Sequence, residues 1–203
     1  MDILKKYDVY ISVGSNCRAT ATLRNLGVRK FSLPFDWCYS SPRTIYEAYI
    51  DDFKQLINCK RSDLELSSMK NVAENFFPKY GFQIMHSLHE NLHLIHRRAR
   101  RMQKVFHSND KILLIYNNVT PVEFEHINYI KKMPSEWMDL KYLHKLKLIL
   151  PDNIDVLVIN YGAPQLKEFS NIAYRYIDEL DKKRSQNGAE ELARLQSMLK
   201  EII

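Results

Sequence analysis

Residues 9–17, with the sequence VYISVGSNC, carry the pattern that decides the fold. The β-branched and aromatic residues at the start of this stretch predict a buried strand, and the small polar residues after them predict a tight turn. A helix is expected from Cys17 onward, because apolar residues recur there at helical spacing and Ser15 or Asn16 can cap the first turn. Gly27 supplies the expected end of that helix.

Two further apolar runs predict strands in the second half of the chain. They lie at residues 111–116 and 154–162, and a weaker strand pattern lies at residues 82–86. Helical patterns precede the first run, over residues 88–106, and fill residues 121–150 between the two. Strands that alternate with helices predict an α/β fold: a single layered domain with a central sheet flanked by helices.

The C-terminal part of the chain is expected to be helical. The spacing of Ile172 and Tyr176 predicts one helix, and an amphipathic pattern after a break near residue 188 predicts a second. On this basis we divide the chain into an α/β candidate catalytic domain, residues 1–165, and a C-terminal helical segment packed on it, residues 166–203. The apolar face of the last helix is expected either to dock on that domain or to mediate self-association.

The composition indicates a folded globular protein. The chain has 203 residues, 45% of them hydrophobic and 27% charged, with 5 Gly, which excludes collagen-like and disordered classes. The formal charge of +6 is a modest excess, and the basic run at residues 96–104 fits phosphate binding or a solvated helix face, so nucleic acid is not the expected partner. The sequence has no apolar run as long as a membrane span and no Cys-x-x-Cys pair, which favours a cytoplasmic, reducing setting.

Cys17 stands where a helix is expected to begin, a position that activates thiols. Unpaired N–H groups and the helix dipole favour the thiolate, and N–H groups of the preceding turn can point at an oxyanion beside the sulfur. The alternative is a small buried cysteine that completes the packing of helix against strand. A histidine close to Cys17 would favour the catalytic interpretation.

A His-Glu-x-x-His sequence occurs at residues 89–93. On one helical face, His89 and His93 would bind Zn²⁺, with Glu90 as general base. The downstream sequence offers no third ligand at the usual spacing. A zinc hydrolase is therefore an alternative, and we predict neither a metal nor another cofactor.

Asp36 lies in the apolar segment LPFDW at residues 33–37. Such surroundings raise the pKa of a carboxyl group unless it is paired. The carboxylate can orient a histidine or bind a substrate hydroxyl, and it can equally cap the following helix or pair with an arginine. Asn117, Asn118 and Asn160 follow strand ends, where α/β sheets bind ligands and where asparagine also simply terminates strands.

Three sequence motifs occur in the first part of the chain. They are an apolar strand that leads into Gly-Ser-x-Cys at residues 11–17, a Leu-Gly-x-Arg helix end at residues 26–29, and a Pro-Phe-Asp-Trp segment at residues 34–37. Together they resemble the family of putative papain-like cysteine peptidases. Met85-His86 and Arg97-Arg98 stand where that family has a histidine element and an arginine-rich helix. The resemblance extends over residues 8–160.

The resemblance implies a cysteine nucleophile at Cys17 and a base at His86, with Asp36 or a strand-end asparagine as the third polar member. Papain-like enzymes usually have a glutamine before the cysteine as an oxyanion donor, and this chain has none there. Asn16 and backbone N–H groups are expected to replace it. The core is expected to be papain-like or Rossmann-like. The residues expected to contact substrate are Gly14, Ser15, Arg18, Trp37, Asn117 and Asn118.

The favoured hypothesis is a cysteine peptidase, or a related thiol hydrolase or acyltransferase, acting on an acyl, peptide or glycan-linked substrate. The glycan-linked possibility comes from the resemblance, since members of the family are often encoded among surface-polysaccharide genes. The main alternative is a sugar- or nucleotide-binding transferase-like domain in which the turn at residues 14–16 holds a phosphate. A non-catalytic interaction protein that uses its C-terminal helix is a further alternative.

Overall fold

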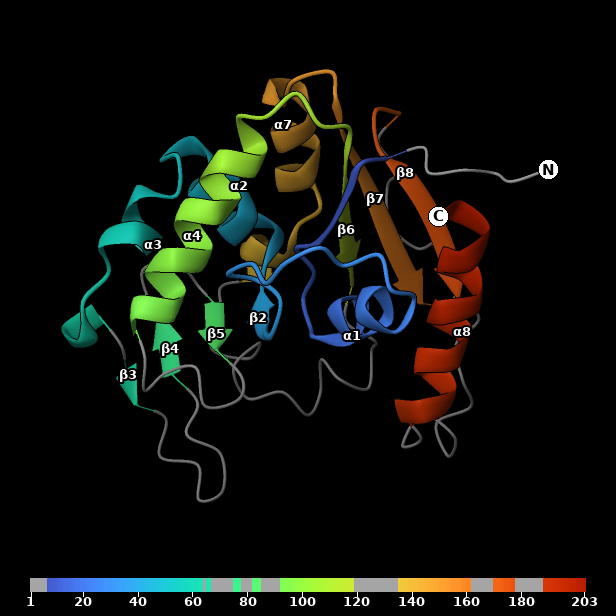
Figure 1. The fold of residues 1–203 in the computed structure, drawn as a ribbon, viewed down its shortest axis with the longest axis horizontal. Helices are drawn as coiled ribbons and strands as arrows, with labels where there is room; N and C mark the ends of the chain where they lie inside the picture. The colour runs from blue at the N-terminus through green and yellow to red at the C-terminus, as the bar shows by residue number, and fades with distance from the viewer. Residues whose placement is uncertain are drawn as a thin grey trace.

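The centre of the structure is a sheet of four parallel strands (Figure 1). This computed structural model describes residues 7–63, 65–66, 75–77, 82–84, 92–118, 135–161, 170–177 and 188–203. In sheet order the strands are β1 (Val9–Ser12), β6 (Ile112–Asn117), β7 (Ile154–Tyr161) and β8 (Ala173–Ile177). The strands expected from the three apolar runs are therefore confirmed, and the runs pair with one another.

Helices cover both faces of this sheet. Alternate residues of β6 point to opposite faces: Leu114 and Tyr116 are buried on one side, and Leu113 and Ile115 on the other. The first side is covered by α2 (Pro42–Ile50), α3 (Lys54–Asn58), α4 (Leu92–Phe106) and α7 (Lys141–Ile149). The second is covered by α1 (Arg18–Asn25) and α8 (Gly188–Ile202). The layered α/β fold that the sequence predicts is confirmed, with the parallel, doubly covered sheet that helical crossovers produce.

A second, smaller sheet is antiparallel and packs beside the first. In sheet order its strands are β2 (Cys38–Ser40), β5 (Phe82–Ile84), β4 (Asn75–Phe77) and β3 (Glu65–Leu66). Of these, β5 alone falls in a stretch with an expected strand pattern, because runs of two or three residues are too short to show a period. Two short 3₁₀ segments also occur, at Arg61–Asp63 and Ser135–Met138.

The ends of α1 and α2 follow from the local sequence. After α1, Gly27 adopts a φ of 71°, which a residue without a Cβ reaches at no steric cost. The N–H groups of Gly27 and Val28 then donate to the Arg24 and Leu23 carbonyls, as in a Schellman motif. Ser41 caps α2, whose first residue is a proline.

The region around β8 differs from the sequence-based prediction. The helix expected around Ile172 and Tyr176 is wrong, because Ala173–Ile177 forms a strand paired in parallel with β7. Tyr174 and Tyr176 are half-buried and the intervening Arg175 is exposed, so the period of two describes this stretch better than the helical period. The division of the chain at residue 165 stays a prediction, although β8 belongs to the central sheet.

Helix α8 docks on the body of the protein. Leu195 and Leu199 are completely buried together with Leu23 of α1 and Ile177 of β8. Figure 1 shows α8, in red, beside β8 and α1. Docking is thus the role that the structure supports, and self-association stays a prediction. Among the described helices, none is long and apolar enough to cross a membrane.

Candidate functional site

The turn at residues 14–16 is held against the end of β6 by a close backbone approach. A Cβ atom on Gly14 would lie 2.5 Å from the backbone nitrogen of Asn117, so glycine is needed here. The backbone N–H and the hydroxyl of Ser15 both donate to the Asn117 carbonyl, at 3.1 and 2.6 Å. Gly14 and Ser15 are buried, and these contacts fix the turn that precedes Cys17.

Asn16 connects the turn to α1 and to β6. Its Oδ1 accepts the backbone N–H of Arg18 and the Nδ2–H of Asn117, both at 3.0 Å. The hydroxyl of Tyr161 donates to the Oδ1 of Asn117 at 2.9 Å. Asn16 and Asn117 are 2% and 0% exposed, so their amides form a buried network. The side chain of Asn16 thus accepts the first N–H of α1, but the N-cap residue of this helix is Cys17.

Cys17 is the N-cap residue of α1. Its carbonyl accepts the Ala21 N–H at 3.0 Å and opens the helical hydrogen bonding, while its side chain makes no capping bond. The thiol is half-buried and is not part of a disulfide. Cys17 therefore combines partial solvent access with the N-terminus of a helix, where the backbone dipole favours a negative charge.

The other two cysteines are buried. Cys38 is 1% exposed, and its Sγ donates to the Pro34 carbonyl at 3.3 Å. Cys59 is 4% exposed, and its Sγ donates to the Leu56 carbonyl at 3.3 Å. Burial raises the pKa of Cys38 well above its ordinary value and that of Cys59 to about 11. Buried, protonated thiols are unreactive, so Cys17 has the best-placed sulfur of the three.

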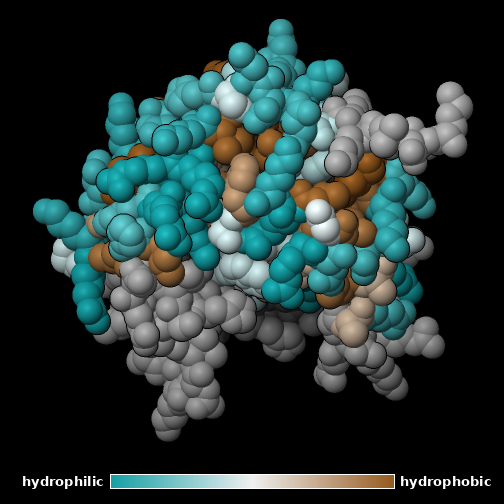
Figure 2. Space-filling view, viewed as in Figure 1, coloured by the Kyte–Doolittle hydropathy of each residue, from teal (hydrophilic) through white to brown (hydrophobic). Residues whose placement is uncertain are grey.

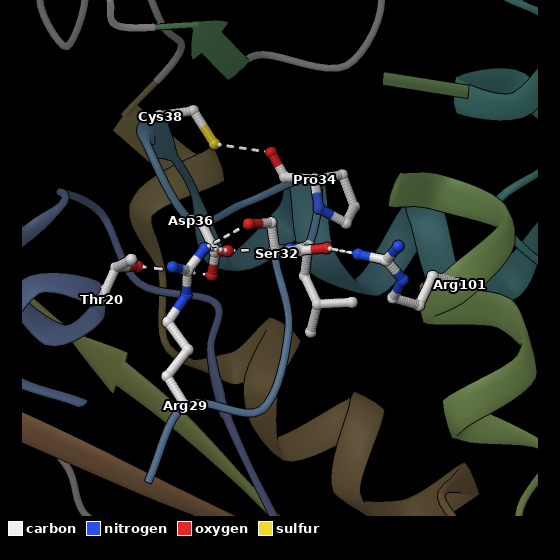
Figure 3. A network of polar contacts seen from close by, with 8 residues as sticks. Thr20, Arg29, Ser32, Pro34, Asp36, Cys38 and Arg101 are labelled. Atoms are coloured by element: carbon white, nitrogen blue, oxygen red, sulfur yellow. Dashed lines mark hydrogen bonds and ion pairs between the residues drawn. The ribbon is translucent and has the colours of Figure 1, made fainter. Parts of the chain in front are cut away.

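Asp36 lies in a buried ion pair (Figure 3). Its Oδ2 accepts from the guanidinium of Arg29 and from the Leu33 N–H, the latter at 2.7 Å. Its Oδ1 lies 3.5 Å from the hydroxyl of Thr20, which belongs to α1. Burial raises the pKa of Asp36, and the bonds from Arg29 and Leu33 oppose that rise. Of the roles considered for Asp36, the structure contains the pairing with an arginine.

Strand β2 is fastened directly to the turn before Cys17. The hydroxyl of Ser40 lies 3.0 Å from the Val13 carbonyl and 2.9 Å from the Gly14 carbonyl. The segment that carries Asp36 and Cys38 is therefore bound to the turn after β1 through Ser40 and to α1 through Asp36. β5 pairs with β2 in turn, with Ile84 opposite Cys38.

The segment with this geometry matches one protein family. Residues 8–141 match the family described as putative papain-like cysteine peptidase (DUF1796). The chain belongs to this family. The resemblance drawn from the three motifs is thereby confirmed. Comparisons with curated proteins and with solved structures gave no match.

The remaining residues expected to contact substrate all lie within the matched segment, residues 8–141. They are Arg18, Trp37 and Asn118. Arg18 and Trp37 are half-buried, and the guanidinium of Arg24 lies 5.6 Å from the centre of the Trp37 ring. The side chain of Asn118 donates to that of Asn160 at 3.1 Å, across the ends of β6 and β7. The structure thus brings Asn16 and Asn117 together, and separately joins Asn118 to Asn160.

The histidines expected to act as base or metal ligands fall mostly outside the described residues. That applies to the expected base His86 and to His89 with Glu90, while His93 is exposed on α4. Within the part of the chain that the structure describes, no three His, Cys, Asp or Glu side chains are grouped closely enough to hold a metal ion. The zinc alternative therefore has no described set of ligands.

Sequence reasoning gave no role to four polar residues at this site. Arg29 ends the Leu-Gly-x-Arg motif, and Arg98 belongs to the arginine-rich helix, so both carried a signal in the family resemblance. Burial raises the pKa of both Asp36 and Cys38, and the nearby charge of Arg98 opposes that rise in each. Thr20 and Ser40 carried no signal, because their bonding partners are distant in sequence.

Proposed function

We propose that this member of the papain-like family is a cysteine-dependent hydrolase or acyltransferase, with Cys17 as its nucleophile. The observation that carries the proposal is the position of Cys17: a half-buried thiol at the N-terminus of α1, in a chain whose other two thiols are buried. A helix N-terminus stabilises a thiolate, and a thiolate attacks an electrophilic carbonyl. A peptide bond is the substrate that the family description suggests.

The proposed base is His86. It follows Ile84 by two residues in the sequence, and Ile84 is paired with Cys38. The family resemblance is what supports His86 in this role, whereas His93 is exposed on α4.

The reaction would proceed through a thioester. His86 accepts the proton of the Cys17 thiol, and the sulfur forms a bond to the carbonyl carbon of the substrate. The imidazolium then gives that proton to the leaving amine or alcohol as its bond to the carbon breaks. Water, or an acceptor hydroxyl or amine, attacks the thioester with the imidazole again as base, and releases the free thiol. Water as the acceptor makes the protein a peptidase, and another acceptor makes it an acyltransferase.

The proposed oxyanion donors are backbone N–H groups of the turn, those of Asn16 and Cys17. On either side of these groups, the Ser15 N–H donates to the Asn117 carbonyl and the Arg18 N–H donates to the Asn16 side chain. Those two bonds fix the direction of the turn and so would preorganise the donors between them. Asn16 acts in this proposal through its position, because its side-chain oxygen is bound within the protein.

In this proposal Asp36 is a positioning residue, which acts on Cys17 through the loop between α1 and β2. Its bonds to Arg29 and Leu33 order the loop between α1 and β2, and its contact with Thr20 ties that loop to the first turn of α1. Loss of the carboxylate would thus displace α1 relative to β2, and with it Cys17. The third polar partner of the histidine is then to be sought among the strand-end asparagines.

Alkylation by iodoacetamide tests this proposal. The rate at each cysteine is measured against pH by peptide mass spectrometry on folded wild-type protein, with an unfolded sample as reference. We expect Cys17 to react at least about tenfold faster than Cys38 and Cys59, and at lower pH than in the unfolded chain. The metal content of the same sample is measured alongside.

Two histidine variants make the test specific. His86→Ala should slow the alkylation of Cys17 at neutral pH, whereas His93→Ala, which removes an exposed histidine of α4, should leave the rate unchanged. Equal reactivity of the three cysteines in the folded protein would refute the proposal. Bound zinc that His93→Ala removes would favour the metal-dependent alternative instead.

A sugar- or nucleotide-binding function is the second candidate. The observation that favours it is the passage from a parallel strand through Gly14 into α1, which is where doubly wound sheets bind phosphates. Thermal denaturation with and without a nucleoside diphosphate sugar tests it. A saturable rise in the melting temperature, together with an unreactive Cys17, would favour this function over the thiol enzyme.

A further inference from the structure

Arg98 of α4 carries a buried donor that the fold leaves unpaired. Its Nη1 is shielded from solvent and has no hydrogen-bond acceptor among the residues that the structure describes. A guanidinium donor buried without an acceptor costs free energy that folding alone does not recover. The exposed side chains of α4, such as Arg97 and Arg100, face solvent instead, and the surface over this helix is hydrophilic in Figure 2.

Two other guanidinium groups near Arg98 already have acceptors. Arg29 donates to Asp36 and, at 2.8 Å, to the hydroxyl of Ser32. Arg101, one turn after Arg98 on α4, donates to the Ser32 carbonyl at 2.9 Å. Figure 3 shows Arg29 and Arg101 on opposite sides of the loop that holds Ser32 and Asp36. Ser32 thus joins the two arginines and fixes where each one points.

The charges of this cluster do not balance. Asp36 is one carboxylate, and three guanidinium groups lie near it: Arg29 pairs with Asp36, and Arg98 interacts with Asp36, Arg29 and Arg101. Cys38, which also faces Arg98, is buried and protonated and adds no negative charge. Arg29 neutralises Asp36 directly, so the partly buried Arg98 has no counter-ion of its own among the residues that the structure describes.

We propose that Arg98 binds the oxyanion group of a ligand, a carboxylate or a phosphate, beside the Arg29–Asp36 ion pair. A guanidinium presents two parallel N–H donors that match the oxygens of either group. The bound oxyanion satisfies the buried Nη1 and supplies the missing negative charge. Arg101, one turn after Arg98 on α4, adds a second positive charge near the bound oxyanion.

The place of this group relative to Cys17 gives the ligand a role. Cys38 is close enough to both Arg98 and Cys17 to respond to the charge of each. An oxyanion on Arg98 and the nucleophile therefore both lie near Cys38. If the ligand is the substrate, this inference rests on the proposed function. The acyl substrate would then carry an anionic group near its reacting carbonyl.

Stabilisation by small oxyanions tests the proposal. Melting temperatures are measured against increasing inorganic phosphate, and separately acetate, at an ionic strength held constant with chloride. The proteins are the wild type, Arg98→Met and Arg97→Met, the last being a matched control from the exposed side of α4. We expect saturable stabilisation of the wild type and of Arg97→Met, and an affinity at least about tenfold weaker in Arg98→Met, because a charge-assisted bidentate contact is lost.

The melting temperature without oxyanion separates a binding role from a structural one. If Arg98 lacks a counter-ion, Arg98→Met in chloride alone should be as stable as the wild type, whereas a structural partner of Asp36 would be destabilised by its loss. If Arg98→Met does not fold, Arg98→Lys takes its place, because lysine keeps the positive charge and lacks the two parallel N–H donors of the guanidinium. A response of Arg98→Lys to phosphate equal to that of the wild type would overturn the proposal.

The remaining outcomes are equally decisive. A wild type that neither phosphate nor acetate stabilises, or an Arg98→Met variant that responds like the wild type, overturns the proposal. A response to acetate points to a carboxylate group in the ligand, and a response to phosphate alone points to a phosphate group. The same titration on Cys17→Ala should give the wild-type affinity, so an unreactive Cys17 and an absent oxyanion site are distinguished as separate failures.

Discussion

Gly14→Ala is expected to be among the most damaging single-methyl additions in this protein. The added Cβ would lie 2.5 Å from the backbone nitrogen of Asn117 and 3.1 Å from its carbonyl oxygen. Both are backbone atoms of β6, a buried strand in the middle of the central sheet. They cannot turn aside as a flexible side chain would, so the ends of β1 and β6 must separate.

The cost follows from the contacts that this separation breaks. Moving the Cβ to an ordinary contact of 3.4 Å requires a shift of about 0.9 Å, and forced overpacking of this kind costs about 1–3 kcal/mol. The same shift weakens both bonds from Ser15 to the Asn117 carbonyl, each worth about 1 kcal/mol. The expected loss is therefore about 2–5 kcal/mol, a large share of the stability of a typical domain.

Gly27→Ala is the matched control. Gly27 has a φ of 71°, but no atom lies within 4 Å of the place that an added Cβ would occupy, so the alanine meets strain without a clash. A left-handed alanine costs about 1–2 kcal/mol. Urea denaturation gives the free energy of unfolding of both variants. The two values can be compared directly if the free energy depends on urea concentration with the same slope in both. Equal losses in the two variants would refute the close approach of the turn to β6.

Three further perturbations test separate parts of the structure. Leu195→Ala should lower the free energy of unfolding by about 2–5 kcal/mol, because the side chain is fully buried; a loss below about 1 kcal/mol would mean that α8 is not docked. Asp36→Asn leaves Arg29 buried without its counter-charge and should cost about 3 kcal/mol in urea denaturation, and a stability equal to wild type would contradict the ion pair. Burial, with the hydrogen bond to Asp155, raises the pKa of Tyr7 from 10.0 to about 12; the stabilisation present below pH 10 should thus be lost as the pH rises from 10 to 12, and Tyr7→Phe should flatten the pH dependence of the urea midpoint over that interval.

The local pattern of residues 9–27 was sufficient to predict the strand, the turn and the helix that starts at Cys17. Each of these elements is specified by neighbours in sequence: β-branched residues in β1, the side chain of Asn16 at the helix start and Gly27 at its end. The family resemblance rested on this stretch together with the motifs at residues 26–29 and 34–37. The candidate nucleophile could therefore be named before any tertiary contact was known.

β8 could not be predicted in the same way. The spacing of Ile172 and Tyr176 fits a helix as well as a strand, and the choice was made by hydrogen bonding to β7, a partner outside the window. Apart from β5, the strands of the small antiparallel sheet escaped prediction for a related reason. Its strands have two or three residues, and pairing between segments far apart in the chain is what defines them.

The sequence by itself determined the elements whose stabilising bonds join near neighbours, which include the thiol at the start of α1. The tertiary structure alone decided why position 14 is a glycine, which arginine pairs with Asp36, and that the Nη1 of Arg98 is buried without an acceptor among the described residues. Those answers depend on Asn117, on the loop at Ser32 and on α4, which folding brings together from separate regions of the chain. Close packing and the pairing of buried charges act through distance in space, and local sequence carries no record of that distance.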